Sequence, residues 1–320
     1  MPTHRGKNTI QSLRLLRLRG FVALLAISLL CASASAQQSQ DDDEVLRVNT
    51  DLVVVNVTVA DGAGKYARGL RLADFKLLED GREQKISTFG SEETPFAAAV
   101  LLDFSGSMEK RLSLARSAAI RFLDGLREED VAAVYRFDSD IEQLQDYSPS
   151  RDLAPLAFGM HAKGMTVLND AVLRAAVDLS RRPEKRRAII VLSDGYDTTS
   201  KASMDKALAA AFSAGVTIYT VDMSEPKTSG VQAAMQARAQ AAGALKDFAS
   251  KSGGRYISTP GGQAMREAFQ SIIEELGNQY TLAYQPSNRA RDGRFREIQV
   301  KLSRAELTAR TRKGYRAPKS

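Results

Sequence analysis

Side chains with oxygen donors follow an apolar segment in the first third of the chain. Residues 97–102 are Ala-Ala-Ala-Val-Leu-Leu, and Asp103, Ser105 and Ser107 come directly after them. A continuous apolar run of this length is typical of a strand buried on both faces of a parallel sheet. A carboxylate and two hydroxyls are the kind of ligand that hard divalent cations such as Mg²⁺ prefer. The same residues also suit an ordinary polar turn with a helix-capping serine.

Two more residues with oxygen donors occupy similar positions further along the chain. Asp194 ends the apolar segment 189–193 and is followed by Gly195, whereas Thr166 precedes a segment with apolar residues at helical spacing. In open α/β sheets, ligands bind beyond the carboxyl ends of the strands. Neighbouring parallel strands would therefore bring together the side chains of Asp103, Ser105, Ser107, Thr166 and Asp194.

The segment around these residues, 95–276, alternates β-branched apolar stretches with amphipathic ones. This alternation predicts an α/β domain with a doubly wound, mostly parallel sheet. The strands that we expect in addition to those ending at Asp103 and Asp194 are residues 131–137, 216–221, 255–258 and a short edge strand at 141–144.

The two flanks of this domain, residues 45–93 and 278–315, show no helical periodicity and predict strands instead. Asp80-Gly81 is a hairpin signal between the expected strands 75–79 and 84–89. Neither flank is long enough to close a β-sandwich alone. We therefore predict that both flanks build one smaller β-sandwich domain, into which the α/β domain is inserted.

The ordered set Asp103-x-Ser105-x-Ser107, Thr166 and Asp194-Gly resembles the metal-ion-dependent adhesion site of von Willebrand factor type A (VWFA) domains. The resemblance covers roughly residues 95–276 and implies a Rossmann-like fold whose one antiparallel edge strand is 141–144. It also implies that these five residues bind Mg²⁺, or Mn²⁺ or Ca²⁺ in its place. Met165 departs from the pattern, because the family often has Gly there. The overall layout resembles VWFA-related secreted proteins described from acidobacteria.

The first 36 residues have the pattern of an export signal. Basic residues precede the apolar segment 21–31, and Ala34-Ser-Ala36 supplies small residues, so we expect cleavage after Ala36. The apolar segment is too short to span a bilayer, which takes about 20 residues, although an uncleaved anchor is the alternative. The mature protein is then periplasmic or secreted. It would begin with residues 37–44, an acidic lead that we expect to be flexible.

Much of the formal net charge of +7 lies in the signal segment, which also holds the single cysteine, Cys31. Without that segment the chain has 40 basic and 38 acidic side chains, so composition gives no reason to expect nucleic-acid binding. Two basic stretches remain. Residues 181–187 are expected to form a solvated loop, with a docking patch as the alternative. Residues 289–316 suit acidic glycans or lipid headgroups, although alternating bases on an exposed strand are the commoner reason for such a pattern.

The functional expectation follows from the charge of the predicted metal site. Two carboxylates and three hydroxyls partly neutralise a divalent cation and leave it one coordination position, which an Asp or Glu of a partner protein can fill. We therefore expect a protein-binding module of the adhesion type and not an enzyme. The alternatives are a structural module stabilised by its metal and a metal-dependent hydrolase, for which no general base is evident. His161 has no cysteine or second histidine to pair with after the signal segment, and we expect it on the surface or in a loop.

Overall fold

The computed structural model of the protein describes residues 52–91, 93–153, 162, 164–224, 232–259 and 262–319. The predicted export signal, the acidic lead and His161 lie outside these described residues. Within them, no helix has the length and apolar character needed to cross a membrane.

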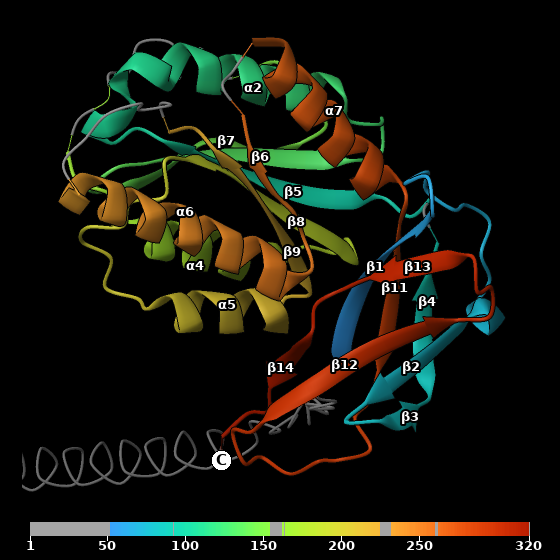
Figure 1. Ribbon diagram of the computed structural model, residues 1–320. Helices are drawn as coiled ribbons and strands as arrows, with labels where there is room; N and C mark the ends of the chain where they lie inside the picture. Colours follow the sequence, from blue (N-terminus) through green and yellow to red (C-terminus); the bar gives the residue numbers. More distant parts are fainter. Residues whose placement is uncertain are drawn as a thin grey trace, which may run out of the picture. The chain divides into compact units, whose positions relative to one another are not determined.

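A six-stranded sheet forms the centre of the α/β domain (Figure 1). All neighbouring strands are parallel except the edge strand β7, which runs antiparallel to β6. In spatial order the strands are β10 (Tyr256–Ser258), β9 (Val216–Asp222), β8 (Arg186–Ser193), β5 (Phe96–Asp103), β6 (Val131–Phe137) and β7 (Ile141–Ser148). The chain moves from β5 to one side of the sheet through β6 and to the other side through β8. The order therefore reverses beside β5, where such sheets form their binding crevice.

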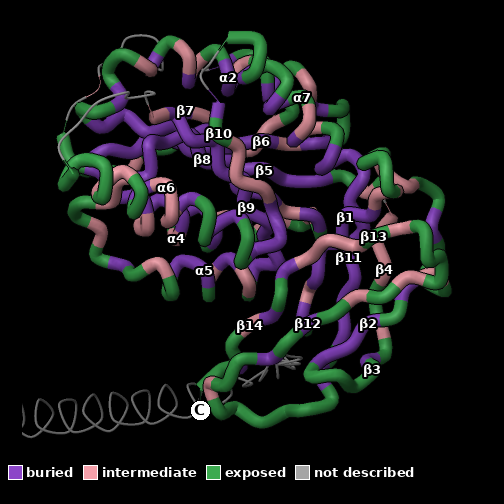
Figure 2. Tube along the Cα trace, in the orientation of Figure 1, coloured by how far each residue is buried: buried purple, intermediate pink, exposed green. Residues whose placement is uncertain are grey.

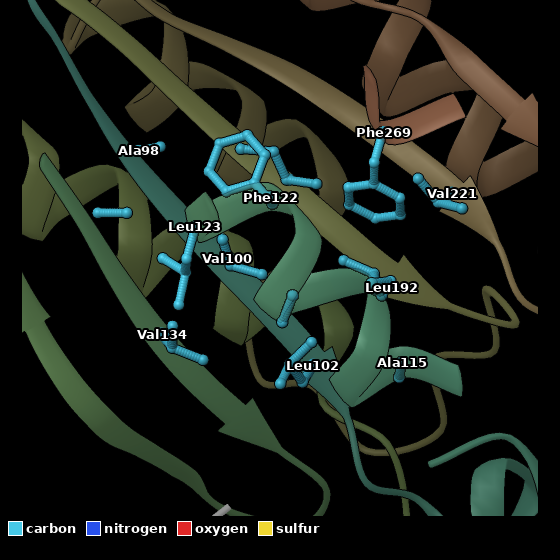
Figure 3. Close-up of a cluster of buried hydrophobic side chains, with 14 of the residues drawn as sticks. Ala98, Val100, Leu102, Ala115, Phe122, Leu123, Val134, Leu192, Val221 and Phe269 are labelled. Atoms are coloured by element: carbon cyan, nitrogen blue, oxygen red, sulfur yellow. The ribbon is translucent and has the colours of Figure 1, made fainter. Parts of the chain in front are cut away.

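Helices cover both faces of this sheet (Figure 1). On one face lie α2 (Leu112–Asp124) and α7 (Gly262–Gly277), and on the other lie α4 (Leu168–Ser180), α5 (Met204–Ser213) and α6 (Gln232–Ser252). Every residue of β5 is buried, which explains its unbroken apolar sequence (Figure 2). Successive residues of β5 point to opposite faces, so Val100 packs with α2 and α7 in the core drawn in Figure 3, whereas Leu101 packs on the other face.

Strands from both ends of the chain form the smaller β domain. One sheet has the order β13-β1-β11-β4 and the other β14-β12-β2-β3. The strands are β1 (Val53–Asp61), β2 (Phe75–Glu79), β3 (Arg82–Gln84), β4 (Ile86–Gly90), β11 (Gln279–Tyr284), β12 (Phe295–Leu302), β13 (Leu307–Arg310) and β14 (Gly314–Arg316). β1 pairs with β11 and β2 with β12, so each sheet contains strands from both flanks. One apolar core lies between the two sheets. The predicted fold class is confirmed: a doubly wound, mostly parallel sheet with a flanking β-sandwich.

The single strand expected at 84–89 is wrong. The hairpin at Asp80-Gly81 is present, with the positive φ values of 48° and 77° that a tight hairpin turn requires. Beyond it, however, β3 ends at Gln84 and β4 begins at Ile86 in the opposite sheet. The buried Gln84 side chain donates to Ser287 at 3.0 Å and accepts its backbone N–H at 2.9 Å. These bonds fix Gln84 in one sheet while the chain crosses to the other.

The basic stretch 181–187 is not simply a solvated loop. Arg186 is 1 % exposed, lies against the Phe96 ring and donates to the carbonyl of Thr94 at 2.5 Å. Arg187 donates to the carbonyl oxygens of Glu184, Arg182 and Ala214. These two arginines bind the start of β8 to its surroundings, so their charges do not form an exposed patch.

Candidate functional site

Asp103 is the most buried of the predicted ligands. It is the last residue of β5, and its side chain has no exposed surface. One carboxyl oxygen accepts the backbone N–H of Ser105 at 2.8 Å, and the other accepts the hydroxyl of Ser193 at 2.5 Å. Both bonds orient the carboxyl at the point where β5 ends and the chain turns into the loop that carries the two serines.

Ser105 and Ser107 connect this carboxyl to Asp194. The two serine hydroxyls lie 3.1 Å apart, at the start of the 3₁₀ helix formed by Gly106–Arg111. The Ser107 hydroxyl in turn lies close enough to the Asp194 carboxyl to lower its pKa. Asp194 directly follows β8, the parallel neighbour of β5. Four of the five predicted residues therefore form one connected set of oxygen atoms at the carboxyl edge of the sheet.

Thr166 is joined to this set through its backbone. Its N–H donates to the Thr198 hydroxyl at 2.8 Å, and its carbonyl accepts the N–H groups of Thr198 and Thr199 in the loop after Asp194. Two residues earlier, the carbonyl of Gly164 accepts the N–H of Gly106 at 3.4 Å. The Thr166 hydroxyl itself makes no hydrogen bond in the part of the chain that the structure describes. Backbone hydrogen bonds thus connect the Thr166 loop to both neighbouring loops. The Thr166 hydroxyl remains available to bind a ligand.

Gly195 allows the loop after Asp194 to pass close to α6. Its φ is 85°, and a Cβ at this position would lie 2.4 Å from the carbonyl oxygen of Ala241. Both observations require glycine, because other residues rarely adopt this backbone conformation and the contact is with rigid backbone. The glycine after Asp194 is therefore explained by the packing of α6 against the loop.

Burial dominates the electrostatics of the two carboxyls. Desolvation raises the pKa of Asp103 to about 7, although the bonds from Ser105 and Ser193 act in the opposite direction. Burial also raises the pKa of Asp194, and the nearby Asp222 adds to this effect. Among the described residues, neither Asp103 nor Asp194 forms an ion pair with a lysine or arginine. The negative charge of the pair is thus balanced by hydroxyl and amide dipoles alone.

This donor set fits a hard divalent cation. It offers two carboxyls and three hydroxyls, all of them oxygen, and an uncompensated buried carboxylate is stabilised when a cation binds to it. No three His, Cys, Asp or Glu side chains converge as a metal cluster in the described ranges. Three of the five predicted ligands are therefore hydroxyls. The identity of the metal and the five-residue ligand set remain predictions.

Two polar residues at this edge of the sheet were not predicted from the sequence. Ser193, at the end of β8, bonds Asp103 and also accepts the N–H of Gly195 at 2.9 Å. Asp222, at the end of β9, accepts the Tyr256 hydroxyl at 2.6 Å and the Ser224 N–H at 2.8 Å. A signal for Asp222 was present, because it also ends an apolar strand; nothing in the sequence distinguished Ser193.

Three further polar residues, Asp138, Tyr196 and Asp197, lie next to the loops of the predicted site. Asp138 accepts from Arg136 at 3.1 Å and from the N–H of Asp140, while its carbonyl accepts the N–H of Val167 beside Thr166. Asp138 therefore supports the Thr166 loop. Asp197 accepts the N–H of Ser200, and Tyr196 is half-buried next to Asp194.

Comparison with known families shows to which family the chain belongs. The family model described as "VWA domain containing CoxE-like protein" matches residues 85–251, just over half of the chain and a range that contains all five predicted ligands. The chain belongs to the von Willebrand factor type A (VWA) family. The predicted family resemblance is thereby confirmed, and the α/β domain is the VWA domain.

Individual relatives are distant. The human (Homo sapiens) protein inter-alpha-trypsin inhibitor heavy chain H3 is 28 % identical over 131 residues, which are 37 % of this chain and 15 % of that protein. The chain thus spans about 15 % of the length of the curated relatives it matches. Among solved structures, a von Willebrand factor type A protein from Catenulispora acidiphila is 13 % identical with a TM-score of 0.48, covering 77 % of this chain and 74 % of that one. An aerotolerance-related membrane protein from Bacteroides fragilis NCTC 9343 is 16 % identical with a TM-score of 0.45, covering 57 % and 98 %.

Proposed function

We propose that this VWA protein is an extracytoplasmic protein-binding module of the adhesion type. It grips an Asp or Glu carboxylate of a partner protein through a divalent cation, Mg²⁺ or in its place Mn²⁺ or Ca²⁺. The residues that would hold the cation are Asp103, Ser105, Ser107, Thr166 and Asp194. The proposal is supported above all by the connected oxygen atoms of Asp103, the two serines and Asp194, in which two buried carboxyls lack a basic partner among the described residues. Its location outside the cytoplasm depends on the predicted export signal.

In this site the cation would bind the partner carboxylate, and the residues of the chain would orient the cation. When bound, the cation supplies a positive charge and an open coordination position for a carboxylate. The chain's own residues orient that position, because Ser105 and Ser193 hold Asp103 and Thr198 holds the backbone of Thr166. The site is thus largely arranged before any ligand arrives, which lowers the entropic cost of binding.

The test uses immobilised short peptides that differ only in a central Glu or Gln. The protein is expected to retain the Glu peptides with Mg²⁺ and to release them with chelator, and to ignore the Gln peptides. Asp103→Asn and Ser107→Ala should each abolish retention, whereas Asp140→Ala, which removes an exposed carboxyl at the same edge, should not. Retention that is equal with and without chelator, or equal for Glu and Gln peptides, would refute the proposal.

One observation favours a second candidate, a structural module whose metal stabilises the fold. Asp103 has no exposed surface, so neutralising its charge would also stabilise the folded state. Thermal unfolding with Mg²⁺ and with chelator separates the two candidates. A large rise in melting temperature without any metal-dependent binding of Glu peptides would favour the structural role.

A further inference from the structure

A cluster of basic side chains lies at one end of the β domain, away from the elements of the predicted metal site. It combines residues of the loop that precedes β12 with residues of the C-terminal segment. We call it the basic edge, and its exposed members are Arg289, Arg291, Arg294, Arg316 and Lys319. Figure 1 shows β12 and β14 side by side near the end of the chain, and the loop before β12 is exposed along most of its length (Figure 2).

Backbone contacts hold the two segments of the basic edge together. The N–H of Ala317 donates to the carbonyl of Arg294 at 2.9 Å, and the N–H of Gly293 donates to the carbonyl of Pro318 at 3.3 Å. The Lys319 side chain crosses directly over Gly293, where an added Cβ would lie 2.5 Å from Lys319 Cε. The bases are therefore brought together by the fold, although they come from different parts of the sequence.

The acidic side chain within the basic edge is already engaged. Asp292 accepts from the buried guanidinium of Arg296 at 3.0 Å and from the N–H of Arg294, and these contacts hold the pKa of its carboxyl below the usual value. Asp80, on the neighbouring hairpin, lies 3.7 Å from the same guanidinium. Asp292 also forms an ion pair with the Arg294 side chain at 3.8 Å. The five bases of the basic edge still outnumber these two carboxylates, so this part of the surface has an excess of positive charge.

An exposed aromatic ring lies among these bases. Phe295, the first residue of β12, is 53 % exposed and pairs directly with Arg316 of β14. Directly paired residues of antiparallel strands point to the same face, so the ring and the guanidinium are neighbours on the surface. A ring flanked by cations suits the boundary between lipid headgroups and acyl chains, where apolar and charged groups meet. A purely hydrophilic polyanion would use the bases but gain nothing from the ring.

We propose that the basic edge docks this protein onto membrane surfaces that carry anionic phospholipids. The bases bind the phosphate-bearing headgroups, and Phe295 enters the outer part of the lipid layer. This peripheral contact needs neither the cation nor the carboxylate partner of the proposed function, so each proposal stands or fails separately.

The test measures partitioning of the purified protein onto phosphatidylcholine vesicles with and without phosphatidylglycerol, at low and high salt. We expect binding only to the anionic vesicles, and weaker binding at high salt. Each base near an anionic surface contributes about a fivefold gain in partitioning, so Arg289→Glu/Arg316→Glu should weaken it more than about tenfold. Phe295→Ser should weaken it several-fold while leaving the salt dependence unchanged, because the ring carries no charge.

The matched control is Arg121→Glu/Lys206→Glu, which makes the same change in net charge at exposed positions on α2 and α5. It should bind anionic vesicles like the unaltered protein. All variants are prepared with the same N-terminus, so differences between them report on the substituted residues, and circular dichroism confirms that each is folded. Equal losses in the control and the basic-edge variant would overturn the proposal. So would binding to a soluble polyanion such as heparin without binding to vesicles.

Discussion

Asp103 combines complete burial with a charge that the protein does not neutralise. Its neighbours are the hydroxyls of Ser105 and Ser193 and a backbone amide, and burial outweighs them in setting its pKa. Each of these groups stabilises a carboxylate less than a cation does. At the scale of single residues, the site is therefore arranged for a positive ion that the polypeptide does not supply.

This raised pKa predicts that Mg²⁺ affinity depends on pH. A metal-bound carboxylate must be deprotonated, so affinity should rise about tenfold per pH unit below the pKa of about 7 and level off above it. Calorimetric Mg²⁺ titrations at several pH values measure this. Asp103→Asn should bind weakly at every pH; an affinity that is flat across the range in the unaltered protein would contradict the prediction.

The same pKa shift has a consequence for stability without metal. A carboxyl whose folded pKa lies above its unfolded value of 3.8 stabilises the folded state at low pH, and this contribution is lost as the pH rises through about 7. In chelator, the free energy of unfolding should therefore decline from pH 6 to pH 8, by an amount of order 1 kcal/mol. Urea unfolding of Asp103→Asn should show a smaller decline, because the titrating group is gone.

At the scale of elements, the contact between α6 and the loop after β8 controls where Asp194 lies. Gly195→Ala would force a Cβ against the carbonyl oxygen of Ala241 and also strain a backbone with a φ of 85°. We expect a loss of about 3 kcal/mol in the free energy of unfolding, measured in urea, together with weaker Mg²⁺ binding.

Gly243→Ala is the matched control on the same helix. Nothing lies within 4 Å of its added Cβ, and a helical glycine costs stability, so this change should raise the free energy of unfolding by about 0.5–1 kcal/mol. If both substitutions had the same effect, the close approach at Gly195 would not be the cause.

The elements themselves were largely predictable, because local patterns determine them. The unbroken apolar sequence of β5 predicted a strand buried on both faces, and Ser203 caps α5 as such a serine should, by accepting the N–H of Lys206. The crossing between β3 and β4 was not predictable, because Gln84 is fixed by Ser287, about two hundred positions away in the sequence. Ser193 was missed for the same reason: its role exists only once β8 lies beside β5.

At the scale of the whole described structure, the VWA domain and the β domain meet at a buried carboxylate. Glu275, near the end of α7, is 1 % exposed. It accepts the Tyr219 hydroxyl at 2.7 Å and the Thr58 hydroxyl at 3.3 Å, and it forms an ion pair with Arg310 of β13. Arg310 also donates to the carbonyl oxygens of Gly253 and Gly254, at the end of α6. One arginine of the β domain thus contacts both α7 and the turn that follows α6 in the VWA domain.

We therefore predict that the two domains unfold in one cooperative transition and that Arg310 contributes to its free energy of unfolding. Among the described residues, Arg310→Met would leave Glu275 with Arg255, 3.5 Å away, as its basic partner, and should cost about 3–5 kcal/mol because a buried charge loses its main partner. Arg304→Met, at an exposed position near β13, should change stability by less than about 0.5 kcal/mol.

Hydrogen exchange read separately in β9 and β11 measures whether the VWA domain and the β domain unfold together. Both strands should lose protection together in Arg310→Met; a loss confined to β11 would mean that the β domain unfolds independently, although the chain connects its two flanks only by way of the inserted VWA domain.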